Sequence, residues 1–227
     1  AMNPAMTKQV NNDAMATLCR LAVAHGVRRL IYASSSGVYG AQDMICTEAT
    51  QPKPQSVYME TKLLGEAILF NHSGFPPTWP HPSPKGMEAV AVRCATCCGP
   101  APRMRLDTIV NTFCKQAFFD KRITVWGGEQ FRTNVHVDDT AMFYIRLLDV
   151  PGKLINGKVF NWTSSNATAL QLAMMVKMQL PDTEIVVDAE KRDPRSYRMD
   201  AGLIKRQLGI EPERTITQAI TDNIAWF

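Results

Sequence analysis

The stretch 28–40 reads Arg-Arg-Leu-Ile-Tyr-Ala-Ser-Ser-Ser-Gly-Val-Tyr-Gly, an apolar run that opens into small residues and hydroxyls. A short apolar run that ends in a glycine-containing turn is typical of a β-strand, so it predicts a strand over 28–35. Before it, apolar side chains recur at helical spacing between Asn12 and Gly26, which predicts an amphipathic helix over 12–25. The carboxyl end of the strand therefore carries serine hydroxyls.

A second strand is expected after an intervening helix. Ser56 is a suitable N-cap for a helix over 57–71, and residues 88–93 form another continuous apolar run. Two nearly continuous apolar strands joined by a helix are the pattern of a βαβ unit. Because neither strand alternates with polar residues, we expect a parallel sheet that is covered on both faces. The proline-rich segment 76–84 predicts a loop.

Shorter helices and strands alternate in the rest of the chain. Hydrophobic spacing predicts helices over 106–119, 169–179, 203–208 and 217–226, and strands over 123–126, 158–162 and 184–188. His136, Asp138 and Asp139 are expected to organise a turn and a helix start rather than to act in catalysis. The fold class is therefore α/β.

Composition and charge exclude several classes of protein. The chain has 227 residues, 45% of them hydrophobic, and a formal net charge of +4. It can build a core, but its charge is too mild to predict a nucleic-acid partner. No apolar run approaches the ~18 residues that a spanning helix needs, and no basic segment precedes an apolar one at the N-terminus. We therefore expect a cytoplasmic protein that binds neither nucleic acid nor a membrane.

The six cysteines are expected to be reduced thiols. Cys94, Cys97 and Cys98 superficially resemble a metal or redox group. A zinc site would need a second pair of ligands, and the four histidines offer none nearby in the sequence. We therefore predict no metal site and interpret the cysteines as small buried hydrophobic residues.

The residues that point most clearly to chemistry are Ser35, Tyr58 and Lys62. Tyr58 and Lys62 stand four positions apart at the start of a predicted helix, so they project from the same helix face. A nearby ammonium group stabilises phenolate and would bring the pKa of Tyr58 closer to the working range of a general base. Ser35 could then hydrogen-bond the substrate hydroxyl that loses its proton. The pair alone is a weak signal, and its position after the serine-rich strand strengthens it.

At these residues the chain resembles the extended short-chain dehydrogenase/reductase family, specifically its NAD-dependent sugar-nucleotide epimerases and dehydratases. The resemblance covers almost the whole chain. Its ordered landmarks are residues 32–40, the Tyr58-x-x-x-Lys62 pair, and residues 93–100, 132–139 and 193–198.

The resemblance implies a partial Rossmann-like parallel sheet interleaved with a small α/β substrate-binding domain. The sheet part would comprise residues 1–100 and 132–163, and the substrate part residues 101–131 and 164–227. The family also implies NAD as the cofactor, with NADP not excluded, a nucleotide-diphosphate sugar as the substrate, and a homodimer formed through the helices 12–25 and 57–71.

The resemblance also assigns roles to individual residues. Ser35, Tyr58 and Lys62 match the catalytic residues, and Tyr58 and Lys62 also match positions that hold the cofactor. Ser34 and Thr96 are further candidates for cofactor binding. Arginines suit phosphate binding because guanidinium groups bind phosphates in a bidentate manner, so the candidates for the substrate diphosphate, besides Ser35 for the sugar, are Arg103, Arg105, Arg132 and Arg195.

Two positions narrow the reaction that the resemblance implies. Related dehydratases carry an Asp-Glu pair where this chain has Ser36 and Gly37, and members that epimerise two carbons carry a cysteine where it has Gly37. The remaining reactions are oxidation and re-reduction at one sugar carbon, as in UDP-glucose 4-epimerases, or a one-way keto reduction.

One family feature is missing from the sequence. No G-x-G-x-x-G or G-x-x-G-x-x-G motif occurs in it, and this motif normally binds the cofactor pyrophosphate at a helix N-terminus. We therefore expect the sequence to start after the fourth strand of the dinucleotide-binding domain, which makes NAD binding by this chain alone doubtful. The alternative function is that of a truncated, non-catalytic homologue that binds a nucleotide sugar or only oligomerises.

Overall fold

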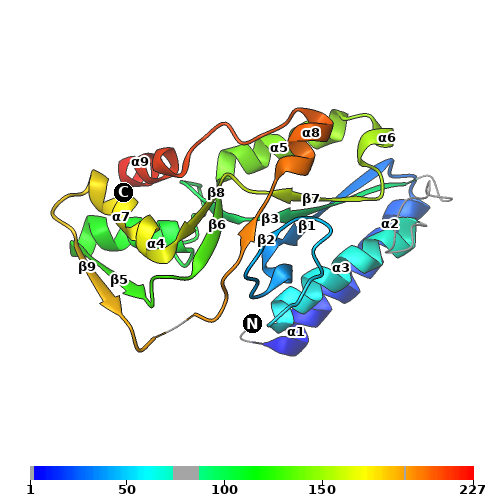
Figure 1. Cartoon of the computed structure of the whole chain (residues 1–227). Coiled ribbons are helices and arrows are strands. Elements are labelled where there is room, and N and C mark those ends of the chain that lie inside the picture. Colours follow the sequence, from blue (N-terminus) through cyan, green and yellow to red (C-terminus); the bar gives the residue numbers. More distant parts are fainter. Residues whose placement is uncertain (1–2, 74–86, 192) are drawn as a thin grey trace.

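The computed structural model describes residues 3–73, 87–191 and 193–227 (Figure 1). The predicted loop 76–84 lies outside these residues. At the centre is a parallel three-stranded sheet in the order β1-β3-β7. Its strands are β1 (Arg29–Ser35), β3 (Glu88–Cys94) and β7 (Lys158–Trp162). The predicted strands 28–35, 88–93 and 158–162 are confirmed, and so is the parallel βαβ unit.

Two helices cover one face of this sheet, α2 (Ala14–Ala24) and α3 (Val57–Ser73). Ala89 and Ala91 of β3 belong to the same buried cluster as Tyr32 and the apolar side chains of both helices. These small side chains let the helices approach the strands closely. The structure thereby confirms the predicted helix over 57–71, extended to Ser73, and nearly all of the helix over 12–25.

The opposite face of the sheet packs on α5 (Val137–Asp149), as Figure 1 shows. Val90 and Val92, which alternate with the two alanines of β3, point into this second cluster. Its centre is a stacked pair, in which the ring centroids of Phe143 and Trp162 lie 4.0 Å apart. The sheet is covered on both faces, as its continuous hydrophobicity predicts.

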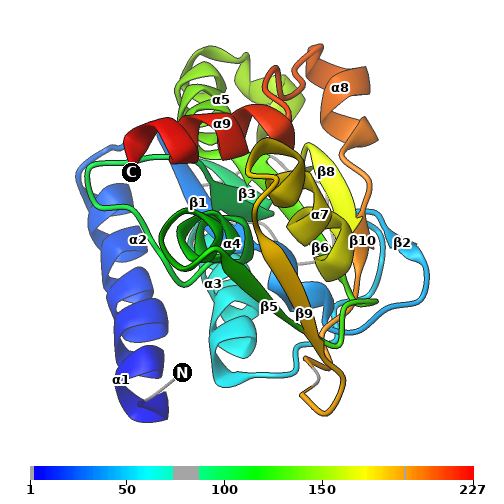
Figure 2. The ribbon, with the colours of Figure 1, turned by 90° about the vertical axis from the view of Figure 1, so that its left-hand side faces the viewer.

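A second group of elements stands beside the sheet and has its own core (Figures 1 and 2). It contains the parallel pair β5–β9 and the helices α4, α7 and α9. The bounds are β5 (Arg122–Trp126), β9 (Glu184–Asp188), α4 (Ile109–Lys115), α7 (Ala169–Gln179) and α9 (Ile216–Trp226). The helix predicted over 106–119 begins only at Ile109, because Thr108 is extended, and its last turn is a π-helix, η3 (Gln116–Asp120).

A third sheet, which the sequence does not predict, has the order β4-β6-β8. Its strands are β4 (Thr96–Cys98), β6 (Phe131–His136) and β8 (Ser165–Thr168), and the pair β2 (Ile45–Cys46) with β10 (Arg198–Met199) is also new. The remaining described elements are α1 (Pro4–Lys8), η1 (Gln9–Asp13), η2 (Ser36–Tyr39), α6 (Gly152–Ile155) and α8 (Gly202–Leu208). The helix predicted over 203–208 is therefore confirmed as α8.

The two-part division of the chain stays a prediction. The two larger cores broadly separate the sheet from the elements around β5 and β9. Tyr197, Met199 and Ile204, however, belong to the core of the sheet, although their sequence positions fall in the predicted substrate part. None of the described helices is both long and apolar enough to cross a membrane.

A buried ion pair joins strand β3 of the central sheet to helix α3. Arg93 Nη2 and Glu66 Oε2 are 2.8 Å apart, and the exposed fractions of the two side chains are 7% and 6%. Arg93 also donates to the hydroxyl of Tyr39 at 3.1 Å, and Tyr39 donates to Asn161 at 2.7 Å. Ser34 completes the set by donating to Glu66. This network connects β1, α3, β3 and β7.

Candidate active site at the carboxyl end of β1

Ser35, the last residue of β1, lies close enough to Tyr58 for its side chain to lower the pKa of the phenol. Ser35 Oγ also accepts from the backbone N–H of Gly37 at 3.2 Å, which caps the short helix η2. Tyr58 stands in the first turn of α3, where Ser56 Oγ accepts from the N–H of Met59 at 3.4 Å. The N-cap predicted at Ser56 is thus present, and it places Tyr58 beside the end of the strand.

Lys62 lies one turn further along α3 and on the same face as Tyr58. Its Nζ is 5.8 Å from the centroid of the Tyr58 ring and donates to the carbonyl of Ala33 at 2.8 Å. The ammonium group is therefore tied to β1, two residues before Ser35. Ser35, Tyr58 and Lys62 come together as the sequence predicts.

The pKa of Tyr58 is raised above its usual value, because burial disfavours the phenolate; the hydrogen bond with Ser35 and the positive charge of Arg105 oppose this rise. The expectation that Lys62 brings this pKa toward neutrality is therefore wrong for this structure. Burial also lowers the pKa of Lys62. At neutral pH Tyr58 is a protonated phenol, and its 42% exposure leaves the ring accessible.

Tyr197 extends the polar surroundings of the Ser35–Tyr58 pair, and the sequence does not single it out. Its hydroxyl lies 3.0 Å from Ser36 Oγ, which also accepts from Thr133 at 3.4 Å. Tyr197 is held next to β1 by these contacts although it comes from the far end of the chain. Its place within the 193–198 landmark was the one signal that could have identified it.

Two of the predicted phosphate-binding arginines meet at one carboxylate. Arg132 Nη2 is 2.6 Å and Arg195 Nη2 is 2.5 Å from Asp193 Oδ2. Although burial opposes ionisation, the hydrogen bond from Arg195 and the charge of Arg132 lower the pKa of Asp193 to about 2. Asp193 therefore stays ionised and partly neutralises both guanidinium groups.

The other two arginines lie in the loop that follows β4. Arg105 forms a bidentate ion pair with Asp107, at 2.7 Å between Nη2 and Oδ2, and both side chains are exposed. Its charge nevertheless reaches Tyr58 and lowers the pKa of the phenol. Arg103 is exposed. Arg105 is thus near Tyr58, and nothing in the structure places Arg103 there.

Ser34 and Thr96 differ in how they relate to the site. Ser34 is buried and its hydroxyl donates to Glu66, on the side of β1 that α3 covers. Its side chain is therefore part of the ion-pair network, and its assignment to cofactor binding stays a prediction. Thr96 begins β4 and is half-buried, next to the end of β3.

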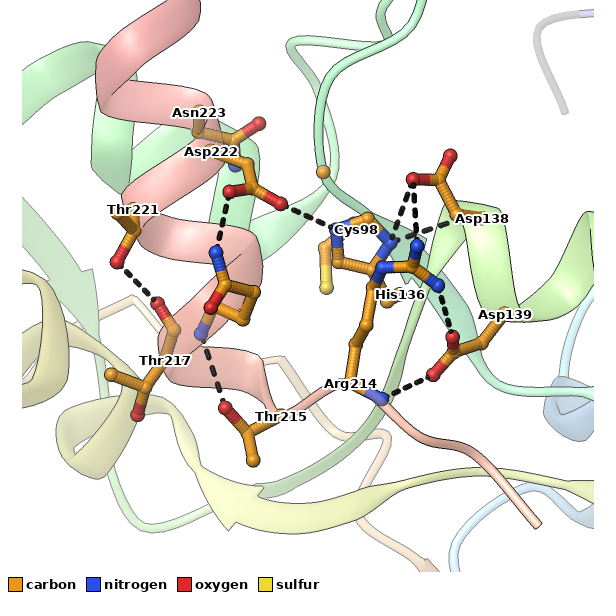
Figure 3. A network of polar contacts seen from close by, with 12 residues as sticks. Cys98, His136, Asp138, Asp139, Arg214, Thr215, Thr217, Thr221, Asp222 and Asn223 are labelled. Carbon is orange, nitrogen blue, oxygen red and sulfur yellow. Dashed lines mark hydrogen bonds and ion pairs between the residues drawn. The ribbon is translucent and has the colours of Figure 1, made fainter.

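A separate polar network joins α5 to α9 (Figure 3). His136 is the N-cap of α5: its Nδ1 accepts from the N–H of Asp138 at 3.1 Å, and its Nε2 is 3.2 Å from Asp222 Oδ2. Asp139 accepts from Arg214 Nη1 at 2.7 Å. The prediction that His136, Asp138 and Asp139 organise a helix start is confirmed.

Comparison with known proteins decides the family. The model of the NAD dependent epimerase/dehydratase family matches residues 1–162. The chain belongs to this family. That assignment confirms the resemblance seen in the serine-rich strand end and the Tyr58-x-x-x-Lys62 pair.

The relatives that this chain matches are longer than the chain. It is 25% identical over 219 residues to an uncharacterised UDP-glucose epimerase of Bacillus subtilis, covering 95% of this chain and 66% of the relative. It is 26% identical to a dTDP-glucose 4,6-dehydratase of Streptomyces griseus, covering 93% of this chain and 62% of that protein. The chain thus spans slightly less than two thirds of each relative.

A solved structure shows the same fold. The UDP-glucose 4-epimerase of Thermotoga maritima, determined with UDP-glucose, superposes with a TM-score of 0.85 at 24% identity. The match covers all of this epimerase/dehydratase family chain and 72% of the solved one. The Rossmann-like α/β class predicted from the sequence is therefore confirmed.

Proposed function

We propose that this chain catalyses the NAD-dependent epimerisation of a nucleotide-diphosphate sugar at one sugar carbon, with Tyr58 as the proton-transfer residue. The observation that carries the proposal is the position of Lys62, whose Nζ lies 5.8 Å from the centroid of the Tyr58 ring and is anchored to β1, with Ser35 close enough to lower the pKa of the phenol. The three residues lie at the carboxyl end of a parallel strand, which is where open α/β sheets bind their ligands. Two relatives named as UDP-glucose epimerases support the choice of substrate class.

The residues at the strand end fit the nicotinamide half of NAD. Tyr58 offers an accessible hydroxyl and Lys62 a half-buried ammonium group, so the two could hold a ribose hydroxyl between them. Thr96 is the further candidate for contact. Bound NAD would supply the acceptor, and then the donor, of a hydride.

Tyr58 transfers the proton, and Ser35 assists it. Tyr58 takes the proton of the sugar hydroxyl as the carbon is oxidised, and returns it when the keto sugar is reduced from its other face. Ser35 hydrogen-bonds the reacting oxygen and keeps Tyr58 oriented. Because the resting phenol is protonated, Tyr58 is ready to act as the acid, whereas its action as the base requires a lowered pKa.

The turn after Ser35 favours epimerisation over dehydration. Ser36 is buried and hydrogen-bonded to Tyr197, so it does not reach the substrate. A side chain at Gly37 would place its Cβ only 3.2 Å from the Met59 methyl group. Neither position supplies the extra acid or thiol that dehydration or double epimerisation would use.

The proposed site for the substrate diphosphate is the Arg132–Asp193–Arg195 group. We expect Arg132→Gln to weaken binding of UDP-glucose by roughly 10-fold to 100-fold, because a hydrogen bond to a charged group contributes about 1.5–3 kcal/mol. Isothermal titration calorimetry measures this, with Arg122→Gln as the control, since Arg122 forms only a loose exposed pair with Glu184, at 3.8 Å. Equal weakening by both variants would contradict the assignment.

The same calorimetry separates the proposal from its rival, a non-catalytic homologue that binds nucleotide sugar or only oligomerises. The rival is favoured by the absence of any G-x-G-x-x-G motif from the sequence. Binding of both NAD and UDP-glucose supports the epimerase. Binding of UDP-glucose without NAD supports the sugar-binding homologue, and binding of neither supports an oligomerising one.

We also propose a homodimer through α2 and α3. These helices pack on each other and expose apolar side chains, among them Leu18 at 50% and Leu64 at 51% exposure. The double variant Leu18→Glu/Leu64→Glu is expected to be a monomer in sedimentation velocity at a concentration where the wild type is a dimer. Met178→Glu, at an exposed position of α7, is the control and should remain dimeric. A monomeric wild type would contradict the proposal.

A further inference from the structure

The sulfurs of Cys94 and Cys97 lie 3.8 Å apart at the junction of β3 and β4. Both also contact the hydroxyl of Thr140 on α5, at 4.0 Å from Cys94 and 3.6 Å from Cys97. Both cysteines are half-buried, whereas Cys19, Cys46, Cys98 and Cys114 are fully buried. The interpretation of all six cysteines as buried hydrophobic residues is therefore wrong for these two.

The two thiols are not equivalent, because the hydrogen bond between them shifts their pKa values in opposite directions. The hydrogen bond with Cys94, helped by that with Thr140 and then by the guanidinium of Arg105, lowers the pKa of Cys97 to about 7, although burial opposes this. The same hydrogen bond and burial raise the pKa of Cys94. Cys97 is therefore the better nucleophile at neutral pH, because the thiolate is the reactive form.

The four remaining cysteines are poor nucleophiles by comparison. Burial raises the pKa of Cys19 and of Cys114 to about 11, and that of Cys98 to about 12. Burial also raises the pKa of Cys46. Reactivity toward small oxidants should therefore concentrate on Cys97.

We propose that Cys94 and Cys97 form an oxidisable dithiol that hydroperoxides convert to a disulfide. A disulfide requires a sulfur–sulfur distance of about 2.05 Å, so the two sulfurs need to approach by less than about 2 Å. In the described part of the chain, no group of three or more His, Cys, Asp and Glu side chains is placed to hold a metal ion. Oxidation is thus the chemistry that this pair supports best.

The oxidation has two balanced steps. The Cys97 thiolate attacks one oxygen of the hydroperoxide: an S–O bond forms, the O–O bond breaks, and the other oxygen leaves as water or an alcohol after taking a proton. Sulfur loses two electrons to the peroxide and becomes a sulfenic acid. Cys94 then attacks this sulfur: the S–S bond forms, the S–O bond breaks, and hydroxide leaves as water with the proton of the Cys94 thiol.

The first test is mass spectrometry of the whole chain after treatment with hydrogen peroxide at neutral pH and alkylation with iodoacetamide. Trypsin releases peptide 94–103, which holds Cys94, Cys97 and Cys98 and no other cysteine. We expect this peptide to be lighter by two hydrogen atoms and to carry its only alkyl group on Cys98. A Cys97–Cys98 disulfide, or three alkylated cysteines after peroxide, would overturn the proposal.

Single variants distinguish the thiol that attacks the peroxide, Cys97, from the thiol that then forms the disulfide, Cys94. Cys97→Ser should abolish both the peroxide reaction and the disulfide, whereas Cys94→Ser should stop at a sulfenic acid on residue 97 that dimedone traps. Cys114→Ser is the control, because its thiol is buried in another core, and it should still form the disulfide. Equal dimedone labelling in Cys97→Ser and Cys94→Ser would contradict the assignment of Cys97 as the attacking thiol.

The pH dependence of cysteine alkylation, measured on the reduced protein, gives a second test of the reactivity of Cys97. The rate of alkylation of Cys97 should be half-maximal near pH 7 and exceed that of Cys114 at this pH by at least about 100-fold. Arg105→Gln should move the midpoint to higher pH, because the variant removes a positive charge. The ionisable groups that act on this dithiol or respond to it are Tyr58 from α3, Cys98 from β4, Arg105 from the loop and Tyr144 from α5. A midpoint above pH 9 in the wild type would overturn the assignment.

Discussion

Replacing Tyr58 with phenylalanine is expected to lower turnover of a nucleotide sugar by about 10²-fold to 10⁴-fold, the range for loss of a general acid–base residue. The ring remains and fills the same space, so the binding of UDP-glucose should change little. Steady-state kinetics with UDP-glucose and added NAD measure the first effect, and calorimetry measures the second. Tyr144→Phe is the matched control, because the buried Tyr144 hydroxyl has no hydrogen-bond partner among the described residues.

The pH profile gives this prediction a second, independent check. Because burial raises the pKa of Tyr58, turnover limited by proton abstraction should rise as the pH rises toward that pKa. Ser35→Ala should shift the profile to higher pH, since the side chain of Ser35 lowers this pKa. Wild-type turnover by Tyr58→Phe would eliminate Tyr58 as the proton-transfer residue.

The largest expected effect on stability comes from Glu66→Gln. The change leaves the guanidinium of Arg93 buried without its counter-charge, and breaking a buried ion pair in this way destabilises a protein by about 3–5 kcal/mol. The free energy of unfolding, measured with urea, should fall by that amount. Glu66 also accepts a hydrogen bond from Ser34, so the substitution also disturbs the contact between α3 and β1.

A variant of an exposed ion pair shows whether burial is the reason for the expected loss of stability. Glu213 pairs with Arg146 at 2.9 Å, but the two side chains are 66% and 46% exposed. Glu213→Gln should therefore lower the free energy of unfolding by less than about 1 kcal/mol. Similar losses for Glu66→Gln and Glu213→Gln would mean that the buried network contributes little.

The predicted elements that proved right are those with a strong local pattern. The helix over 169–179 matches α7, and the apolar runs over 28–35 and 88–93 match β1 and β3 to within one residue. Spacing alone also placed Tyr58 and Lys62 on one face of α3. These features depend on neighbours within a few residues in the sequence.

The features that sequence reasoning missed depend on contacts between distant segments. The strand β6 is not predicted from the sequence, because two of its buried residues, Thr133 and Asn134, are polar and interrupt the hydrophobic pattern of a strand. The neutralisation of Arg132 and Arg195 by Asp193 requires the chain to bring residues 132 and 193 together. The raised pKa of Tyr58 results from burial in the folded chain, which no local motif encodes.

The central proposal is that this chain moves a hydride from a nucleotide sugar to NAD at the Ser35–Tyr58–Lys62 site. The most direct test is to mix the wild-type chain with NAD and UDP-glucose and to follow the near-ultraviolet absorbance of reduced nicotinamide in a single turnover. We predict that this absorbance appears with the wild type and is lost in Tyr58→Phe. Absence of the signal from wild-type protein to which calorimetry shows both ligands bound would contradict the claim.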